Sequence, residues 1–171
     1  SSEKLIEFET NLASRFNAGE IKFPVHLSDG SEKPLLEIFS KIKAHDWVFT
    51  SWRSHYQCLL KGVPPHELEA AILNGRSIAL CFPEYNVFSS AIVGGQISIA
   101  TGVAMGLKRS KSDGWVWCFI GDMTSETGIA QCDPSGIFQG SLRALRCCLC
   151  LGIRRIAGKF ADVKKPLIEI G

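Results

Sequence analysis

The stretch W-V-W-C-F-I-G-D-M-T-S-E-T-G, residues 115–128, decides the fold class of this chain. Its first six residues are all apolar, which is typical of a strand buried on both faces in a parallel sheet covered by helices. Gly121 and Asp122 then end the strand. Because open α/β sheets bind ligands beyond the carboxyl ends of their strands, this turn predicts a ligand site. A carboxylate there suits Mg²⁺ with phosphate oxygens; the alternative is that Asp122 only caps the next helix.

The composition is that of an ordinary globular domain. The chain has 171 residues, of which 46% are hydrophobic and 21% are charged. Its net charge of +2 is too close to neutral to indicate a nucleic-acid partner or an anionic membrane. No apolar run approaches the roughly 18–20 residues of a membrane span. The start, S-S-E-K-L-I-E-F-E-T, is acidic and amphipathic, which argues against a signal peptide, and the missing initiator Met predicts a fragment or a processed product.

The seven cysteines favour a reducing compartment over a disulfide scaffold. Their number is odd, and Cys118 lies inside the apolar run, where a free thiol behaves as a small hydrophobic group. We therefore expect an intracellular protein.

Helical and strand-like patterns alternate along the rest of the first 131 residues. Apolar spacing predicts helices over residues 3–16 and 33–45, a strand end over 46–51, and a third helix that begins at Pro64–Pro65 and ends at Asn74–Gly75. Residues 76–90 have weak periodicity and are predicted to be a loop. Residues 91–108 predict a helix in which Gly102 and Gly106 need a compensating reason, such as close approach of another backbone.

The last 40 residues differ in character from those before them. Residues 132–171 are rich in Cys and Arg near their start and show no stable period. Two short apolar stretches, 153–156 and 167–170, are candidates for added strands. We therefore predict an α/β domain with an N-terminal helical segment over residues 1–131 and an atypical tail over 132–171.

Four segments in order carry a family resemblance. They are F-P-V-H-L-S-D-G-S-E (23–32), S-W-R-S-H (51–55), A-I-V-G-G-Q-I-S-I-A-T-G-V-A-M-G-L-K (91–108) and W-C-F-I-G-D-M-T-S-E-T-G (117–128). Over residues 20–131 the chain resembles the alpha subunit of thiamine-diphosphate-dependent 2-oxo-acid dehydrogenases. That family shows H-L-x-x-G-x-E, an aromatic-Arg pair, I-V-G-x-Q and G-D-G in this order. Trp52 stands where Tyr is usual, and Met123 where Gly is usual.

The resemblance implies the thiamin-diphosphate-binding fold, an open and mostly parallel α/β sheet with helices on both faces, here incomplete at its C-terminus. It implies oxidative decarboxylation of a 2-oxo acid, with thiamine diphosphate and Mg²⁺ as cofactors. Asp122 would bind the metal, and the implied catalytic residues are His26 and His55, although His55 equally suits a local structural cap. The implied cofactor-binding residues are Trp52, Arg53, Ala91, Val93, Gly94, Gly121, Met123 and Thr124.

The resemblance also implies what lies outside this chain. The family's second metal ligand is an Asn about 30 residues after the Asp, and no Asn follows Asn86 here. The cofactor lies between two domains, and the second, the pyrimidine-binding domain, belongs to a beta subunit in a heterotetramer. A lipoyl-bearing acyltransferase would accept the acyl group, in the cytoplasm or the mitochondrial matrix. This chain alone is therefore expected to be inactive.

Three alternatives stay open. Trp52, Met123 and the missing Asn favour a non-catalytic pseudo-subunit. A transketolase-like or acetoin-cleaving enzyme would share the cofactor but not the acceptor. A generic nucleotide-binding module is disfavoured, because G-x-G-x-x-G and G-x-x-x-x-G-K-[ST] are both missing from the sequence.

Overall fold

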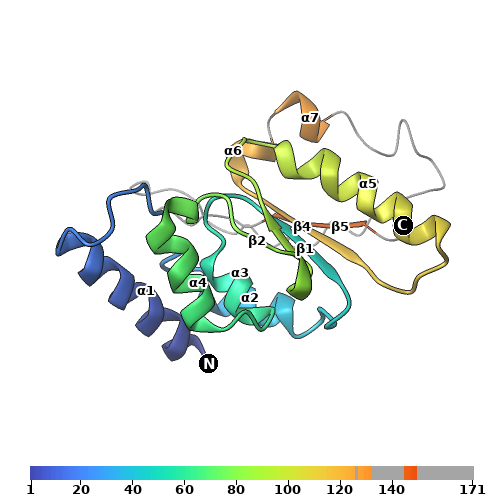
Figure 1. The fold of residues 1–171 in the computed structure, drawn as a ribbon. Coiled ribbons are helices and arrows are strands. Elements are labelled where there is room, and N and C mark those ends of the chain that lie inside the picture. Colours follow the sequence, from blue (N-terminus) through green and yellow to red (C-terminus); the bar gives the residue numbers. More distant parts are fainter. Residues whose placement is uncertain (126, 132–144, 150–171) are drawn as a thin grey trace, which may run out of the picture.

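The computed structural model describes residues 1–125, 127–131 and 145–149, which build one sheet with helices packed against it (Figure 1). The described strands are β1 (Trp47–Thr50), β2 (Cys81–Phe82), β3 (Val87–Ser89), β4 (Val116–Ile120) and β5 (Leu145–Leu149). The described α-helices are α1 (Ser2–Asn17), α2 (Glu32–Phe39), α3 (His55–Leu60), α4 (Pro65–Ala71), α5 (Gly95–Arg109), α6 (Asp122–Ser125) and α7 (Gly128–Gln131). A π-turn, η1 (Ile72–Arg76), follows α4, and a 3₁₀ turn, η2 (Pro83–Tyr85), separates β2 from β3.

The sheet has the strand order β2-β3-β1-β4-β5. β3 and β4 both run parallel to β1, and β5 runs parallel to β4. Only β2 is antiparallel, to its neighbour β3. Parallel neighbours need crossover segments, which α3, α4 and α5 supply. The predicted open, mostly parallel sheet is confirmed.

β4 is the most deeply buried strand, as its continuous apolar sequence predicts. All five of its residues are buried, and Val116 has no exposed surface. It pairs with β1 in a register that sets Trp47 opposite Val116 and Phe49 opposite Cys118. This pairing places the Gly121–Asp122 turn at the same sheet edge as the residues that follow β1.

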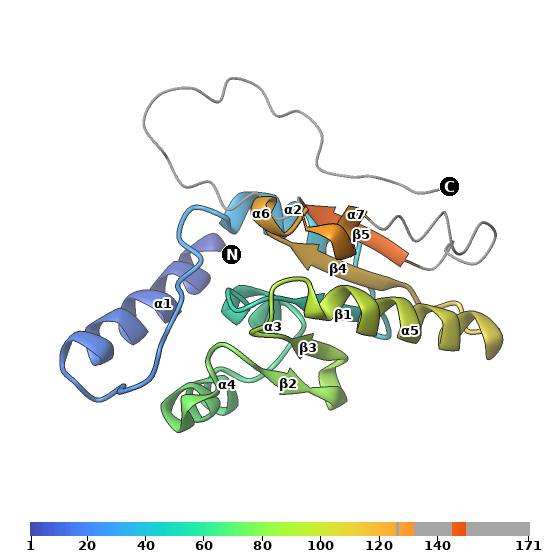
Figure 2. The same ribbon diagram turned by 90° about the horizontal axis from the view of Figure 1, so that it is seen from above.

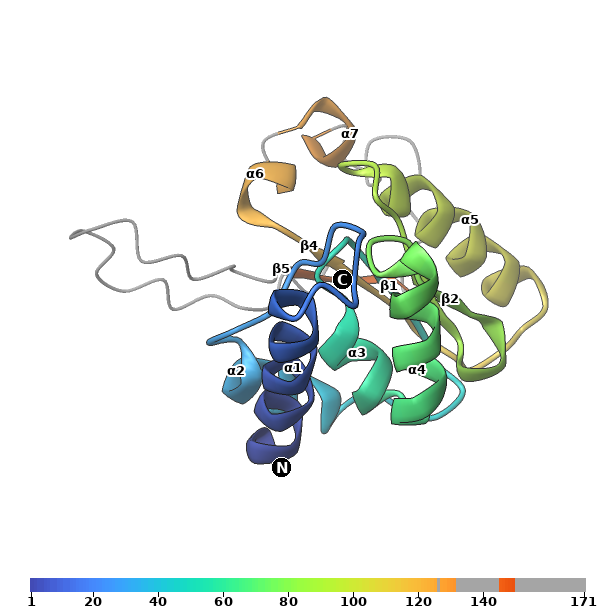
Figure 3. The same cartoon turned by 60° about the vertical axis from the view of Figure 1, so that its left-hand side comes forward.

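One face of the sheet is covered by α1, α2, α3 and α4, which Figure 3 shows together on one side. α1 is amphipathic and buries Leu5, Glu9 and Leu12, which recur at helical spacing. Leu12 is 1% exposed, and burying a leucine side chain contributes about 2 kcal/mol. It belongs to a core cluster that also contains Trp117 of β4.

The opposite face is covered by α5 (Figure 2). Ile97, Ala100 and Ala104 of this helix pack with Phe49 and Cys118 in a second core cluster. The predicted arrangement of helices on both faces is thus confirmed. Gly102 and Gly106 are on the exposed side of α5, and a Cβ added to either would meet no described atom within 4 Å. Within the described residues, no other backbone approaches these two glycines.

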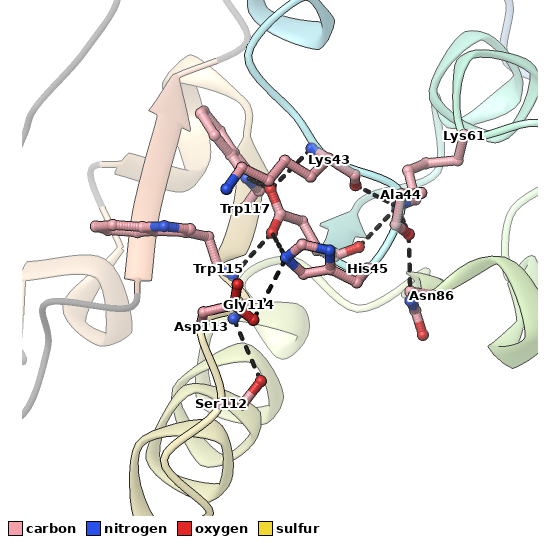
Figure 4. A network of polar contacts seen from close by, with 11 residues as sticks. Lys43, Ala44, His45, Lys61, Asn86, Ser112, Asp113, Gly114, Trp115 and Trp117 are labelled. Carbon is pink, nitrogen blue, oxygen red and sulfur yellow. Dashed lines mark hydrogen bonds and ion pairs between the residues drawn. The ribbon is translucent and has the colours of Figure 1, made fainter.

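A polar network holds the amino ends of β1 and β4 together (Figure 4). Asp46, directly before β1, accepts hydrogen bonds from the backbone N–H of Trp115 at 2.9 Å and from the indole N–H of Trp117 at 3.0 Å. Lys61 Nζ donates to the carbonyl oxygens of Lys43, Ala44 and Asp46 at 3.2, 2.9 and 2.7 Å. Burial lowers the pKa of Lys61. These bonds fix the edge of the sheet opposite the predicted ligand edge.

Several elements differ from the sequence predictions, among them α3, which was not predicted. The loop predicted over residues 76–90 is wrong, because it contains β2 and β3. The helix predicted over 33–45 ends at Phe39, and the Ser40 hydroxyl donates to the Glu37 carbonyl at 2.6 Å just beyond that end. Strand β5 was not predicted. β2 and β3 are 2 and 3 residues long, so their strand conformation depends more on pairing with neighbouring strands than on local sequence.

Among the described residues, Cys58 and Cys81 are free thiols. No helix among the described residues is long and apolar enough to cross a membrane. The strands suggested over 153–156 and 167–170 lie outside the described residues. The division of the chain at residue 131 stays a prediction.

Candidate functional site

The carboxyl ends of β1, β3 and β4 share one edge of the sheet because these three strands are parallel. Trp52 and Arg53 follow β1, residues 91–94 follow β3, and Gly121 and Asp122 follow β4. Three of the four motif segments, although far apart in the sequence, therefore meet at one place. This is the edge at which open α/β sheets bind ligands.

The glycine turn before α5 packs against the turn after β4. Gly94 has a left-handed backbone conformation with φ of 75°, which favours glycine. A Cβ added to it would lie 2.6 Å from Cγ2 of Ile129 and 3.9 Å from Cγ2 of Thr124. The space above Gly94 is thus filled by this chain's own residues. Gly94, without a side chain, lets the segment before α5 pack closely against α7 and the turn after β4.

The backbone and side chains just before Gly94 are open to the surroundings. Ala91 is exposed, Ile92 is 72% exposed and Val93 is 47% exposed. The described part of the chain covers these residues only in part. They form a surface beside Gly94 on which a ligand or another chain can pack.

The turn after β4 is a single helical turn, α6, which begins at Asp122. Its backbone is closed by Thr127, whose N–H and hydroxyl donate to the Thr124 carbonyl at 3.1 and 2.6 Å. Thr124 itself is 5% exposed, whereas Met123 is 75% exposed. Met123 is not among the described residues with positive φ. The turn therefore accepts methionine in place of glycine without a left-handed backbone at that position.

His26 and Trp52 face each other across the same edge. Their ring centroids are 6.1 Å apart with an angle of 49° between the rings. Desolvation by surrounding protein, the nearby Arg53 guanidinium and then His55 all lower the pKa of His26 below the ordinary 6.5. The structure thus brings His26, Trp52 and Arg53 together, in surroundings that lower the pKa of His26 and so favour its neutral form.

Replacing Arg53 with glutamine is expected to raise the pKa of His26 towards 6.5, because one positive neighbour of the imidazolium is lost. The lowered pKa means that protonation of His26 opposes folding as the pH falls below 6.5, and this effect is smaller in the variant. Arg53→Lys, which keeps the charge, is the matched control and keeps the pKa low. An NMR titration of the His26 ring protons measures the pKa in both variants. Equal titration midpoints in Arg53→Gln and Arg53→Lys would contradict this account.

His55 is placed differently from His26. Its side chain is fully buried, with Nδ1 3.1 Å from Oε1 of Glu9 and Nε2 2.9 Å from the hydroxyl oxygen of Ser77. Both ring nitrogens therefore already have protein partners. Its assignment to the catalytic set stays a prediction.

Two buried polar residues of the site were not predicted from the sequence. Glu9 on α1 is 4% exposed, and Gln96 at the start of α5 has no exposed surface. Gln96 donates from Nε2 to the Phe119 carbonyl at 3.2 Å, while its Oε1 has no partner in the described structure. The burial of Glu9 could have been predicted from the sequence, because this carboxylate lies between Leu5 and Leu12 on the apolar face of a helix. The importance of Gln96 could have been predicted from its position directly after Gly94 and Gly95.

The donors at this edge fit a metal-bound diphosphate better than a metal held by protein alone. No cluster of three or more His, Cys, Asp or Glu side chains suited to a metal occurs in the described residues. Mg²⁺ typically takes one or two carboxylates and completes its shell with water and phosphate oxygens. The Arg53 guanidinium suits a diphosphate and the exposed segment 91–93 suits an apolar ring, whereas the metal-binding role of Asp122 stays a prediction from the sequence.

The comparisons with known proteins agree with this arrangement. The family model described as "Dehydrogenase E1 component" matches residues 2–131. The chain is also similar to "Pyruvate dehydrogenase E1 component subunit alpha-3, chloroplastic" of Oryza sativa subsp. japonica, with 28% identity over 140 residues. That match covers 71% of this chain and 33% of the rice protein, so the chain spans about a third of its relative. Because the family model spans most of the chain and all four motif segments, the chain belongs to the dehydrogenase E1 component family.

Proposed function

We propose that the chain is the diphosphate-binding part of the alpha subunit of a thiamine-diphosphate-dependent 2-oxo-acid dehydrogenase. The observation that carries this proposal is the meeting of three motif segments at one edge, with Gly94 against Thr124 and Ile129. The rice relative is by its name a pyruvate dehydrogenase subunit, which supports a 2-oxo acid as substrate. Bound thiamine diphosphate supplies the electron sink for decarboxylation.

The diphosphate and its metal would be held from two sides of the edge. Asp122 supplies a carboxylate oxygen to Mg²⁺, and Arg53 grips the diphosphate with paired N–H donors. Main-chain and hydroxyl groups of the turn after β4 complete the anion contacts, from Gly121, Met123 and Thr124.

The ring end of the cofactor would lie on the exposed segment before α5. Ala91, Val93 and Gly94 present main-chain groups and small side chains there. Trp52 packs beside them and orients His26, whose ring is 6.1 Å away. Because its surroundings lower the pKa of His26 and favour the neutral imidazole, His26 can accept a proton from substrate at one nitrogen or donate one from the other.

We further propose that a beta subunit carrying the pyrimidine-binding domain covers this edge, as part of a heterotetramer. Large exposed apolar side chains favour such an interface. They are found on the segments that meet at the edge and on α5: Ile92, Val93, Ile99, Met123 and Ile129. The exposed glycines of α5, Gly102 and Gly106, allow a partner backbone to approach closely. A lipoyl acyltransferase would then accept the acyl group from the assembled enzyme.

For localisation we propose an intracellular compartment, the cytoplasm or the mitochondrial matrix. The free thiols of Cys58 and Cys81 suit a reducing environment. The rice relative is named as chloroplastic, so the chloroplast is a further compartment to test.

A second candidate is a non-catalytic pseudo-subunit that pairs with a beta subunit and binds cofactor weakly or not at all. Trp52 in place of Tyr removes a phenolic hydroxyl, and no Asn follows Asn86 to complete the metal site. A transketolase-like or acetoin-cleaving subunit remains a variant of the first proposal, with the same cofactor and another acceptor.

Calorimetric titration with thiamine diphosphate distinguishes these candidates. With Mg²⁺ and a beta subunit from the same source, we expect saturable heat that EDTA removes. Asp122→Ala is expected to weaken binding by roughly 30-fold or more, because a charged metal ligand is lost. Asp113→Ala is the control, since this carboxylate is 87% exposed and near the opposite edge, next to His45. Absence of heat with and without the beta subunit would instead support the pseudo-subunit.

A further inference from the structure

Two buried carboxylates hold the backbone of the segment that carries His26, here called the His26 loop (residues 26–31). Glu9 Oε2 accepts the N–H of Ser28 at 2.6 Å, and Glu32 Oε1 accepts the N–H of Gly30 at 3.1 Å. Glu9 is 4% exposed and Glu32 is 9% exposed. Because charge-assisted hydrogen bonds out of reach of water are strong, these bonds fix the course of the loop.

Both carboxylates are in turn held by the first turn of α3. His55 Nδ1 is 3.1 Å from Glu9 Oε1, and the Tyr56 hydroxyl donates to Glu32 Oε1 at 3.0 Å. Facing a carboxylate oxygen, His55 Nδ1 is placed to donate an N–H hydrogen bond to Glu9. Burial and then the Glu9 charge raise the pKa of Tyr56, which keeps its phenol protonated as a donor.

The first turn of α3 directly follows Trp52 and Arg53, which lie at the carboxyl edge. Residues 52–56 thus include both the two residues at the carboxyl edge of the sheet and the two side chains that hold Glu9 and Glu32. Ser77 completes the arrangement with its hydroxyl 2.9 Å from His55 Nε2. With the loop in this course, the His26 ring lies 6.1 Å from the Trp52 ring.

We propose that His55 and Glu9 are positioning residues, whose buried pair holds the His26 loop so that His26 stands against Trp52 and Arg53. In this arrangement His55 acts through Glu9 and the Ser28 backbone, and does not touch substrate. The consequence for catalysis rests on the proposed function. The position of His26 is a property of the free protein.

The direction in which the pKa of His26 changes distinguishes a positioning role of Glu9 from a purely electrostatic effect of its charge. Glu9→Gln removes a negative charge, and by charge alone this would lower the pKa of His26 further. Release of the loop moves His26 away from Arg53 and from the protein atoms that desolvate it, so its pKa rises towards 6.5. A folded but unrelated structural change would leave this pKa where it is.

The experiment is an NMR titration of His26 in the full chain without cofactor, combined with hydrogen exchange of backbone amides. In Glu9→Gln we expect the pKa of His26 to rise and the Ser28 amide to exchange at least about tenfold faster. The exposed His45, 49% accessible, is the internal control, and its titration is expected to stay unchanged. A fall or no change in the His26 pKa, or unchanged Ser28 exchange, would overturn the proposal.

Ser77→Ala is the second variant, because it removes the hydroxyl on His55 Nε2 and leaves the buried Glu9–His55 pair in place. We expect the pKa of His26 to rise in this variant too, by less than in Glu9→Gln. If Glu9→Gln does not fold, Ser77→Ala tests the proposal in its place. Unchanged His26 titration in that case would count against it. All these readouts need no cofactor, so they stand even if thiamine diphosphate fails to bind.

Discussion

Replacing Asp46 with alanine is expected to lower the free energy of unfolding by about 3 to 5 kcal/mol. This carboxylate is 1% exposed and accepts hydrogen bonds from the backbone N–H groups of Trp115 and Lys43 and from the indole of Trp117. The bonds join the turn before β1 to the start of β4. Alanine removes the acceptor of three donors at the point where the two central strands begin.

Asp113→Ala is the matched control for this prediction. Asp113 belongs to the same network through His45, 3.8 Å away, but it is 87% exposed. An exposed ion pair contributes little, so we expect a change below about 0.5 kcal/mol. Urea unfolding of both variants measures the difference. Equal midpoints would show that the buried Asp46 bonds do not hold β1 and β4 together.

Replacing Gly94 with alanine is expected to destabilise the chain by about 2 to 4 kcal/mol and to disturb the cofactor edge. The left-handed φ of 75° strains any residue with a Cβ, and that Cβ would lie 2.6 Å from Ile129. Since Ile129 belongs to α7, which follows the turn after β4, relief of this contact shifts the segment before α5 against that turn. We therefore also expect cofactor binding to weaken at least about tenfold.

Gly102→Ala, in the same α5 helix, is the control with the opposite expected sign. Its Cβ meets no described atom within 4 Å, so the variant is expected to be more stable by about 0.5 to 1 kcal/mol. In the double variant Gly94→Ala/Ile129→Ala, the contact is relieved but the strained φ remains, so only part of the stability returns. Thermal unfolding of the three proteins checks this, and equal effects at Gly94 and Gly102 would contradict it.

The long elements could be predicted from the sequence because their patterns are local. The apolar run of β4, the amphipathic spacing of α1 and the small-residue pattern of α5 each reflect which face is buried. β2, β3 and β5 were not predicted. Their short segments pair with β1 or β4, or with each other, and that pairing depends on residues far away in the sequence.

The site could be predicted in part for the same reason. The Gly121–Asp122 turn has a local signal, whereas the approach of His26 to Trp52 depends on the loop after α1 and was expected only from the family resemblance. The buried pair of Glu9 and His55 joins residues 46 positions apart. No local pattern relates them, although an acid on the apolar face of α1 was visible in the sequence.

Hydrogen exchange of the chain with its beta subunit, with and without thiamine diphosphate and Mg²⁺, tests the central claim most directly. If the segments beyond β3 and β4 form one cofactor surface, amides in residues 91–97 and 121–125 will exchange at least about fivefold more slowly with cofactor. Amides in residues 43–46 and 112–115, at the opposite edge, will exchange at unchanged rates. Protection confined to that opposite edge, or no protection in either motif segment, would contradict the account.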